Sequence, residues 1–418
     1  MPSSSLNAPA TSDSPRFLKI ALVLGLLTAI GPFAIDMYLP ALPSIGQSLG
    51  ADIGAVQLSL TAFFISMGAG QLIYGPVSDM VGRKSPLYFG LLLFAAASVG
   101  CALATDIRML IVLRFVQGFG AAAMMAVPRA IVRDLHTGTE AARLMALLML
   151  VFSVSPILAP LVGSGVIAVA GWRGVFWAVT LASLAALAMA GVFLKETRPP
   201  ADRVESSLGS ALAGYALLLR DRHFMGLVFI GGFVMAGFFT YLANSSFVMI
   251  GHWGLTPTQF SLAFSLNAAG FIGASQLTGM LGERWGLVRV VRLGALGSAS
   301  MMVAMLAHFM AGGDRIEVLI VLFLAASAFA GLVVPTTAVL ALEEHGAIAG
   351  TASALMGTLQ MLTGAVAMSV VGLFTDGRPL PMVVGMSAGM FIALGLTAAT
   401  LGMRQPARTK EHTKVTAR

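Results

Sequence analysis

The sequence is dominated by long apolar runs that are separated by short polar, charged or Pro/Gly turns. A run of about 20 mostly apolar residues is long enough to cross a bilayer as a helix. Runs of this kind begin near residues 20, 56, 86, 109, 144, 174, 224, 258, 288, 316, 348 and 380. Apolar and polar residues do not alternate in them, which excludes a transmembrane β-barrel. The sequence therefore predicts an all-α integral membrane protein with twelve transmembrane helices.

Composition supports a membrane location and excludes several classes of function. Only 10% of the residues are charged, against roughly 25% in ordinary globular proteins. These charged residues are too few to cover the water-exposed surface of a soluble protein of this size. The single cysteine, Cys101, lies in an apolar run and excludes a disulfide framework or a cysteine-based metal site. No P-loop, G-x-S-x-G or H-E-x-x-H sequence occurs, so we do not expect an enzyme.

The distribution of Lys and Arg predicts the orientation, because cytoplasmic loops of membrane proteins carry more of both. With the N-terminus inside, nineteen fall on the cytoplasmic side: Arg16, Lys19, Arg83, Lys84, Arg133, Arg143, Lys195, Arg198, Arg203, Arg220, Arg222, Arg284, Arg289, Arg292, Arg404, Arg408, Lys410, Lys414 and Arg418. Four fall on the other side: Arg108, Arg173, Arg315 and Arg378. We therefore expect both termini in the cytoplasm. Topology explains the net charge of +7 better than nucleic-acid binding does.

One connection is much longer than the others and divides the chain into six runs plus six. It is rich in charge, Pro and Ser, and it contains a Leu-bearing stretch suited to an amphipathic helix in the membrane interface. The predicted parts are a disordered N-terminal lead (1–16), a first six-helix bundle (17–194), a cytoplasmic linker (195–222), a second six-helix bundle (223–404) and a basic cytoplasmic tail (405–418).

The two halves also share a sequence motif. Gly75, Asp79 and Gly82, after the second run, recur 204 residues later as Gly279, Glu283 and Gly286, after the eighth. This spacing predicts two six-helix pseudo-repeats. Parallel repeats of this size place a substrate site at their interface near the middle of the membrane.

Three motifs resemble those of the major facilitator superfamily. The loop Gly75-Pro-Val-Ser-Asp79-Met-Val-Gly82-Arg83-Lys84 resembles its signature between spans 2 and 3. Leu113-Arg114-Phe-Val-Gln117-Gly118-Phe-Gly120 resembles its span-4 motif. Ser155-Pro156-Ile-Leu-Ala-Pro160-Leu-Val-Gly163-Ser-Gly165 resembles the span-5 antiporter motif of drug:proton exchangers.

Further segments resemble one subfamily, the Bcr/CflA drug-resistance proteins. They are Asp36-Met-Tyr-Leu-Pro40-Ala-Leu-Pro43, Trp172-Arg173 with Phe176-Trp177, and Ala349-Gly350-Thr351-Ala352-Ser353-Ala354-Leu355. The resemblance implies a secondary transporter of the bacterial inner membrane that exports small amphiphilic drugs or toxic metabolites in exchange for protons. It implies a monomer that needs no cofactor except the coupling proton. Transport of a normal metabolite by the same fold, and a non-transporting membrane receptor, remain alternatives.

Two deep charges are the candidates for proton coupling. Asp36 is the only carboxylate well inside an apolar run, and an ionisable group in that position indicates function. Burial favours the neutral acid, whereas a nearby cation favours the charged form. Arg114 enters the fourth run from the same outer side and reaches a comparable depth, so the two are expected to share one cavity. The alternatives are that Asp36 marks the end of its helix and that Arg114 is a structural tie between spans 4 and 1.

The signature loop is expected to act as a cytoplasmic gate. Its candidate residues are Gly75, Asp79, Gly82, Arg83 and Lys84, with Arg133 and Asp134 at the end of span 4 as plausible partners. A contact made in only one conformation biases an inward–outward equilibrium. In the antiporter motif, Pro156 and Pro160 are expected to bend span 5, while Gly163 and Gly165 permit close packing.

Polar residues inside spans of the second half are candidates for the substrate cavity: Tyr241, Asn244, Asn267 and Gln360. Hydrogen bonds between helices, worth about 0.6 kcal/mol each in membrane proteins, explain them equally well. The sequence leaves this choice open.

Overall fold

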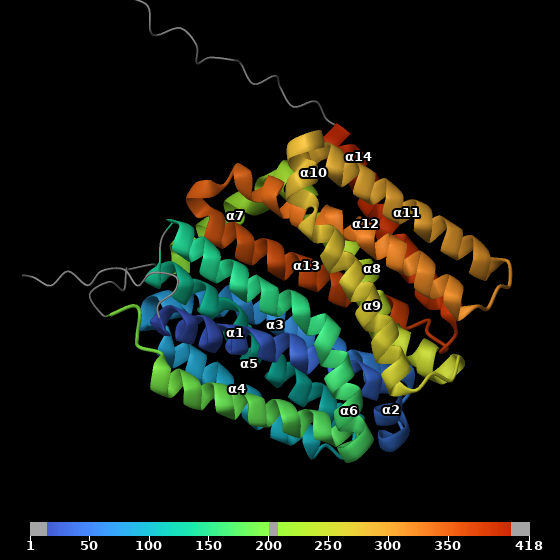
Figure 1. The fold of residues 1–418 in the computed structure, drawn as a ribbon, viewed down its shortest axis with the longest axis horizontal. Helices are drawn as coiled ribbons and strands as arrows, with labels where there is room; N and C mark the ends of the chain where they lie inside the picture. Colours follow the sequence, from blue (N-terminus) through green and yellow to red (C-terminus); the bar gives the residue numbers. More distant parts are fainter. Residues whose placement is uncertain (1–14, 137, 200–207, 403–418) are drawn as a thin grey trace, which may run out of the picture.

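The chain forms a helical bundle in a computed structural model that describes residues 15–136, 138–199 and 208–402 (Figure 1). Within these ranges there is no β-strand. The predicted basic tail lies outside the described residues, as do nearly all of the predicted N-terminal lead and residues 200–207 of the predicted linker.

The described elements follow one another with short connections. Those of the first half are α1 (Pro15–Asp36), η1 (Leu39–Ala41), α2 (Leu42–Leu49), α3 (Ile53–Val81), α4 (Lys84–Ala102), α5 (Ile107–Leu135) and α6 (Gly138–Phe193). Those of the second half are α7 (Leu208–Arg220), α8 (Arg222–Ser246), η3 (Phe247–His252), α9 (Pro257–Gln276), α10 (Thr278–Trp285), α11 (Leu287–Met310), α12 (Ile316–Glu343), η4 (Gly346–Ile348), α13 (Ala349–Gly372) and α14 (Pro379–Gly402).

The described helices account for the twelve predicted crossings. Ten of the described segments are long and apolar enough to span a membrane. One of them, in α6, contains two predicted spans that meet at Gly171, where φ is 64° and ψ is −173°. The remaining span is α9, whose 20 residues include several polar ones. The predicted fold class, two six-helix pseudo-repeats in the membrane, is therefore confirmed.

Local signals in the sequence explain where the helices begin and turn. The carboxylate of Asp52 accepts the N–H of Ala55 at 2.7 Å and caps α3. Thr256, which lies 204 residues later, caps α9 and forms a capping box with Gln259. At the ends of α3 and α10 that are predicted to face the cytoplasm, Gly82 (φ 97°) and Gly286 (φ 82°) adopt a backbone conformation that favours glycine.

The two halves repeat one packing arrangement. In the first half Gly118 of α5 lies against the carbonyl of Phe63 on α3, without room for a Cβ atom. In the second half Gly331 of α12 lies in the same way against the carbonyl of Phe271 on α9. Both close approaches join the second and fourth spans of their half, as the repeat predicts.

Two helix pairs make the longest contacts between the halves. α13 packs along α3, and α9 packs against α6 (Figure 1). We call the contact between α13 and α3 the first seam and that between α9 and α6 the second seam. The first seam runs along both helices: Gly54 lies near the carbonyl of Gly372 at one end, and the hydroxyl of Thr358 donates to the carbonyl of Gly68, further along α3, at 3.0 Å. Any conformational change that separates the halves must work around these two seams.

Candidate functional site

α1 ends at Asp36 because its hydrogen-bond ladder tightens and then breaks. The N–H of Tyr38 donates to Ile35, three residues back, and Pro40 has no N–H to offer the carbonyl of Asp36. Asp36 is only 5% exposed. Among the described residues, its carboxylate has no hydrogen bond and no ion pair. A carboxylate buried in a membrane span without a protein partner is a site for a proton or for a cation.

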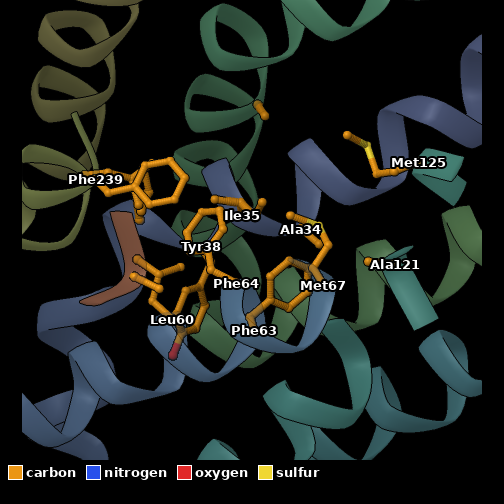
Figure 2. Close-up of a cluster of buried hydrophobic side chains, with 14 of the residues drawn as sticks. Ala34, Ile35, Tyr38, Leu60, Phe63, Phe64, Met67, Ala121, Met125 and Phe239 are labelled. Atoms are coloured by element: carbon orange, nitrogen blue, oxygen red, sulfur yellow. The ribbon is translucent and has the colours of Figure 1, made fainter. Parts of the chain in front are cut away.

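Arg114 of α5 lies beside this helix end and is fully buried. Its Nη1 donates to the carbonyl of Ala34 at 3.3 Å and to Gln117 at 2.7 Å. The guanidinium lies 4.5 Å from the ring centre of Tyr38 and 4.2 Å from that of Phe63. Figure 2 shows Ala34, Tyr38 and Phe63 in this packed region. A cation at the C-terminus of a helix is favourable, so Arg114 stabilises the last turn of α1.

The two predicted coupling residues therefore lie at the same end of α1, as expected from their depth. Arg114 contacts the carbonyl two positions before Asp36, and no contact between the two charged groups is present in the described chain. Nε and Nη2 of Arg114 have no hydrogen-bond partner. Arg114 thus caps the end of α1 through Nη1, and two of its other donors have no partner.

Arg83 is the centre of the signature loop and is 3% exposed. Nε and Nη2 donate to the carboxylate of Asp134 at 2.7 and 3.0 Å, and Nη1 donates to Asp79 at 2.7 Å. Burial alone would lower the pKa of Arg83, but these hydrogen bonds raise it above its usual value. The loop is therefore held by a permanently charged arginine and two carboxylates.

Glu196, which follows α6, completes this cluster and was not foreseen from the sequence. Its two oxygens accept the backbone N–H groups of Arg83 and Lys84 at 2.8 and 3.1 Å, and Oε1 also accepts that of Arg198 at 3.0 Å. Burial alone would raise the pKa of Glu196, but these N–H groups hold it below its usual range. Glu196 thus ties the start of α4 to the end of α6.

The remaining gate candidates have separate places. Gly82 makes the turn, whereas Gly75 has open space around it. The ammonium of Lys84 lies 5.3 Å from the ring centre of Tyr88. Of the two predicted partners, Asp134 joins the cluster, while a nitrogen of Arg133 would lie 3.1 Å from a Cβ placed on Gly350 of α13. Arg133 is therefore the residue of this group that reaches the other half.

The antiporter motif lies on the second seam. The hydroxyl of Ser265 on α9 donates to the carbonyl of Ile157 on α6 at 2.6 Å. The hydroxyl of Ser261 lies 2.8 Å from the carbonyl of Pro160 on α6 and 2.8 Å from that of Pro257 in its own helix, and it has one hydrogen for the two. Gly163 packs on the backbone of Met37, next to Asp36, where an added Cβ would lie 2.6 Å from a carbonyl oxygen.

Gly165 behaves differently, because nothing lies within 4 Å of the position that its Cβ would take. The motif therefore contacts the other half through the carbonyls of Ile157 and Pro160, and it contacts the end of α1 through Gly163. Gly165 makes neither contact.

A cluster of polar side chains joins the halves at the end that is predicted to face outward, and we call Gln57, Asn244 and Thr375 the outer latch. Nε2 of Gln57 donates to Asn244 at 2.9 Å and to the carbonyl of Ala243 at 3.2 Å. The hydroxyl of Thr375 donates to the same oxygen of Asn244 at 2.7 Å. Outside the latch lies a groove of about 690 Å³ that is lined by both α3 and α13.

Of the four candidates for a substrate cavity, Tyr241, Asn244 and Asn267 are buried, and Gln360 is half-buried. Asn244 belongs to the outer latch. Nδ2 of Asn267 donates to the hydroxyl of Tyr241 at 3.3 Å, and the ring of Tyr241 lies against Phe323 at 4.2 Å between centres. Gln360 lies against Gly231, and its Nε2 has no partner. In this conformation Tyr241, Asn244 and Asn267 make hydrogen bonds between helices, and a role of any of the four residues in a substrate cavity stays a prediction.

These features define a membrane transporter built from two bundles with a polar latch and an intramembrane acid between them. The family profile described as Major Facilitator Superfamily matches residues 24–250. The chain belongs to this superfamily.

Curated relatives cover nearly the whole chain. The "Uncharacterized MFS-type transporter YdgK" of Bacillus subtilis is 36% identical over 393 residues, which are 92% of this chain and 97% of the relative. The "Bicyclomycin resistance protein homolog" of Haemophilus influenzae is 28% identical over 382 residues, 89% and 94% of the two chains. "Multidrug resistance protein D" of Escherichia coli is 30% identical over 369 residues, 85% and 89%. The resemblance to the superfamily and to its drug-resistance members is confirmed.

Solved structures share the fold at low identity. A D-xylose–proton symporter aligns with a TM-score of 0.71 and 18% identity over 91% of this chain and 97% of its own. A bacterial homologue of the human lysosomal transporter Spinster, in an inward-facing conformation, aligns with a TM-score of 0.72 and 13% identity over 93% and 96%.

Proposed function

We propose that this chain exports small amphiphilic drugs or toxic metabolites in exchange for protons, by alternating access. The observation that carries the proposal is Asp36, a carboxylate buried in a membrane span without a protein partner. The names of the relatives, a bicyclomycin resistance protein homologue and a multidrug resistance protein, support a drug-like substrate.

Asp36 supplies the coupling. A protonated acid is neutral and tolerates burial, whereas the carboxylate needs water or a cationic group. Proton and substrate therefore favour different arrangements around the end of α1. Arg114 holds the backbone of that end through the carbonyl of Ala34, so a rearrangement of the end of α1 that accompanies protonation of Asp36 changes this contact. No cofactor is required besides the proton.

The contacts between the halves supply the conformational states. The outer latch and the serine contacts of α9 hold the outer part of the bundle together. Opening toward the outside requires that Gln57 leave Asn244, while the cluster around Arg83 keeps the cytoplasmic ends of α3, α4 and α5 together as one body. We propose that the protein works as a monomer in the bacterial inner membrane with both termini in the cytoplasm.

Drug resistance and proton release test the proposal. The protein is expressed in an efflux-deficient strain and screened against a panel of drugs, and substrate-induced proton release is measured with purified protein. Asp36→Asn is expected to reach the membrane in normal amounts but to lose proton-driven export. Asp106→Asn is the matched control, because Asp106 caps α5 on the outer side and Asn caps equally well.

Three results would contradict parts of the proposal. Full resistance and unchanged proton release with Asp36→Asn would exclude Asp36 as the coupling acid. Equal losses in Asp36→Asn and Asp106→Asn would show a general effect of replacing a carboxylate. Absence of any resistance, together with proton-coupled uptake of a metabolite, would favour the metabolite transporter that the sequence left open.

A further inference from the structure

α7 presents an apolar face that nothing in the described chain covers. Its exposed residues are Leu212, Ala213, Ala216, Leu217, Leu219 and Arg220. Leu212 is 64% exposed and Leu217 is 57% exposed. Because residues at spacings of 3, 4 and 7 share one side of a helix, these positions form one continuous face, with Leu218 buried on the opposite side.

The place of α7 in the chain keeps this face near the bilayer. α7 ends at Arg220, and the membrane span α8 begins at Arg222, so a single residue separates them. That residue, Asp221, caps α8 through the N–H groups of His223 and Phe224 at 2.8 and 3.1 Å. The junction is therefore rigid, and α7 cannot move far from the membrane surface.

We propose that the exposed face of α7 docks into the cytoplasmic leaflet and that it prefers anionic lipid. The leucines enter the boundary between headgroups and acyl chains, and Arg220 and Arg222 lie at the level of the headgroup phosphates. An amphipathic helix of this kind binds through its buried apolar area and through attraction of its basic residues to anionic lipids. Arg220, at the end of this face, and the exposed Arg222, at the start of α8, give the charge preference.

The docked helix contacts the start of α13, where the second half meets Arg133 of the first half. On its covered side Gly214 lies near the side chain of Thr351, in the first turn of α13. The neighbouring residue, Gly350, faces Arg133 of the first half. Nε2 of His345 contacts the carboxylate of Asp221 at 3.2 Å, which fixes the loop before α13 to the α7–α8 junction. Lipid bound to α7 therefore restrains the element of the second half that meets the gate.

Site-directed fluorescence tests the docking independently of any transported compound. A fluorophore is attached at Ala216→Cys in a Cys101→Ala background, and the full chain is placed in nanodiscs of neutral lipid or of neutral and anionic lipid. We expect a quencher on the lipid, near the headgroup, to quench the label, and soluble iodide to have little effect. A label at Ala311, in an outer loop, is the control and should show the opposite pattern.

The charge preference has its own control. Anionic lipid is expected to increase lipid quenching at Ala216 at least twofold, and Arg220→Gln with Arg222→Gln should remove the increase. Leu212→Gln with Leu217→Gln should remove the lipid quenching itself. Free access of iodide to Ala216 in every lipid would overturn the proposal. Loss of iodide access that depends on protein concentration, in detergent without lipid, would assign the face to a second copy and would also overturn it.

The link to the gate is measured with a spin-label pair at Arg143→Cys and Glu344→Cys, one in each half on the cytoplasmic side. The distance distribution should change between neutral and anionic nanodiscs, and the arginine variants should abolish that change. A distribution that ignores lipid charge while α7 is docked would remove the coupling to the gate from the proposal.

Discussion

Loss of the outer latch should shift the protein toward the conformation that is open to the outside. Gln57→Leu keeps the size of the side chain but removes the hydrogen bonds of Nε2 to Asn244 and to the carbonyl of Ala243. Two hydrogen bonds in a membrane interior are together worth about 1.2 kcal/mol. The ratio of outward-open to outward-closed protein should then rise about sevenfold, since about 1.4 kcal/mol is a factor of ten.

Distances between spin labels measure this ratio. Leu103→Cys and Met310→Cys place labels on the outer side of the two halves, at side chains that are 59% and 70% exposed. Gln47→Leu is the matched control, because Gln47 is an exposed outer glutamine without a hydrogen bond across the halves in the described chain. The long-distance population should grow in Gln57→Leu and stay unchanged in Gln47→Leu.

A double-mutant cycle with Asn244→Leu shows whether the effect belongs to the pair. If Gln57 and Asn244 act through each other, the second substitution adds less to the shift than it does alone. Equal populations in wild type and Gln57→Leu would refute the argument that these hydrogen bonds close the outer side. So would full additivity in the cycle.

The remaining predictions concern close contacts and the cytoplasmic cluster. Gly163→Ala should lower the free energy of unfolding by about 1–3 kcal/mol, because its Cβ would meet the backbone of α1. Gly165→Ala, in open space, should leave the unfolding midpoint in detergent unchanged, and equal effects would contradict the packing. Gly82→Ala should cost about 1–2 kcal/mol, since its φ is positive, while Gly75→Ala is the neutral control in the same melting assay. The pKa of Glu196 is lowered in the folded protein, so its stabilising contribution is present above the ordinary carboxyl pKa of about 4.3 and disappears as pH falls through the lower folded value. Glu196→Gln should therefore lower the melting temperature at pH 7 and make the melting temperature depend less on acid pH. A melting temperature of Glu196→Gln with the same dependence on acid pH as wild type would exclude this role.

The sequence predicted the fold because a bilayer leaves few solutions. Every apolar run had to be a helix, since backbone groups in lipid must be satisfied within the segment. The offset of 204 residues between Gly82 and Gly286 gave the repeat, and the positive φ of both residues shows that the motif encodes a backbone turn. Helix assignment and span count differ at Gly171, where two predicted spans share α6.

The signature loop was partly predictable for a similar reason. Asp79, Arg83 and Asp134 are charged residues close to one membrane face, so their association follows from topology, and the structure joins them through Arg83. Glu196 was missed, because it stands among basic residues of a linker and binds backbone N–H groups rather than a charged side chain. A single sequence contains no signal for such a partner.

The outer latch was beyond the sequence for a different reason. Gln57 and Asn244 are 187 residues apart, and each looks like one more polar residue in an apolar run. Asn244 was a candidate both for a substrate cavity and for a hydrogen bond between helices, and the sequence left that choice open. Only the packing of the halves shows that its partners are Gln57 and Thr375. Whether Asp36 and Arg114 are coupled remains a prediction, since depth alone can be estimated from residue counts.

The contact between α9 and α6 has a consequence for how the halves move. Ser261 and Ser265 donate to backbone carbonyls, and a carbonyl recurs at every residue of α6. A hydroxyl that leaves one carbonyl can therefore engage another on the same face of α6, three or four residues away, whereas Gln57 meets one side-chain amide, that of Asn244, and one carbonyl, that of Ala243. Hydrogen bonds between the serines of α9 and the carbonyls of α6 can therefore persist while the halves shift, whereas the hydrogen bond between Gln57 and Asn244 either forms or breaks. It also follows that a side-chain substitution on α6 does not remove the backbone carbonyls to which the serines donate.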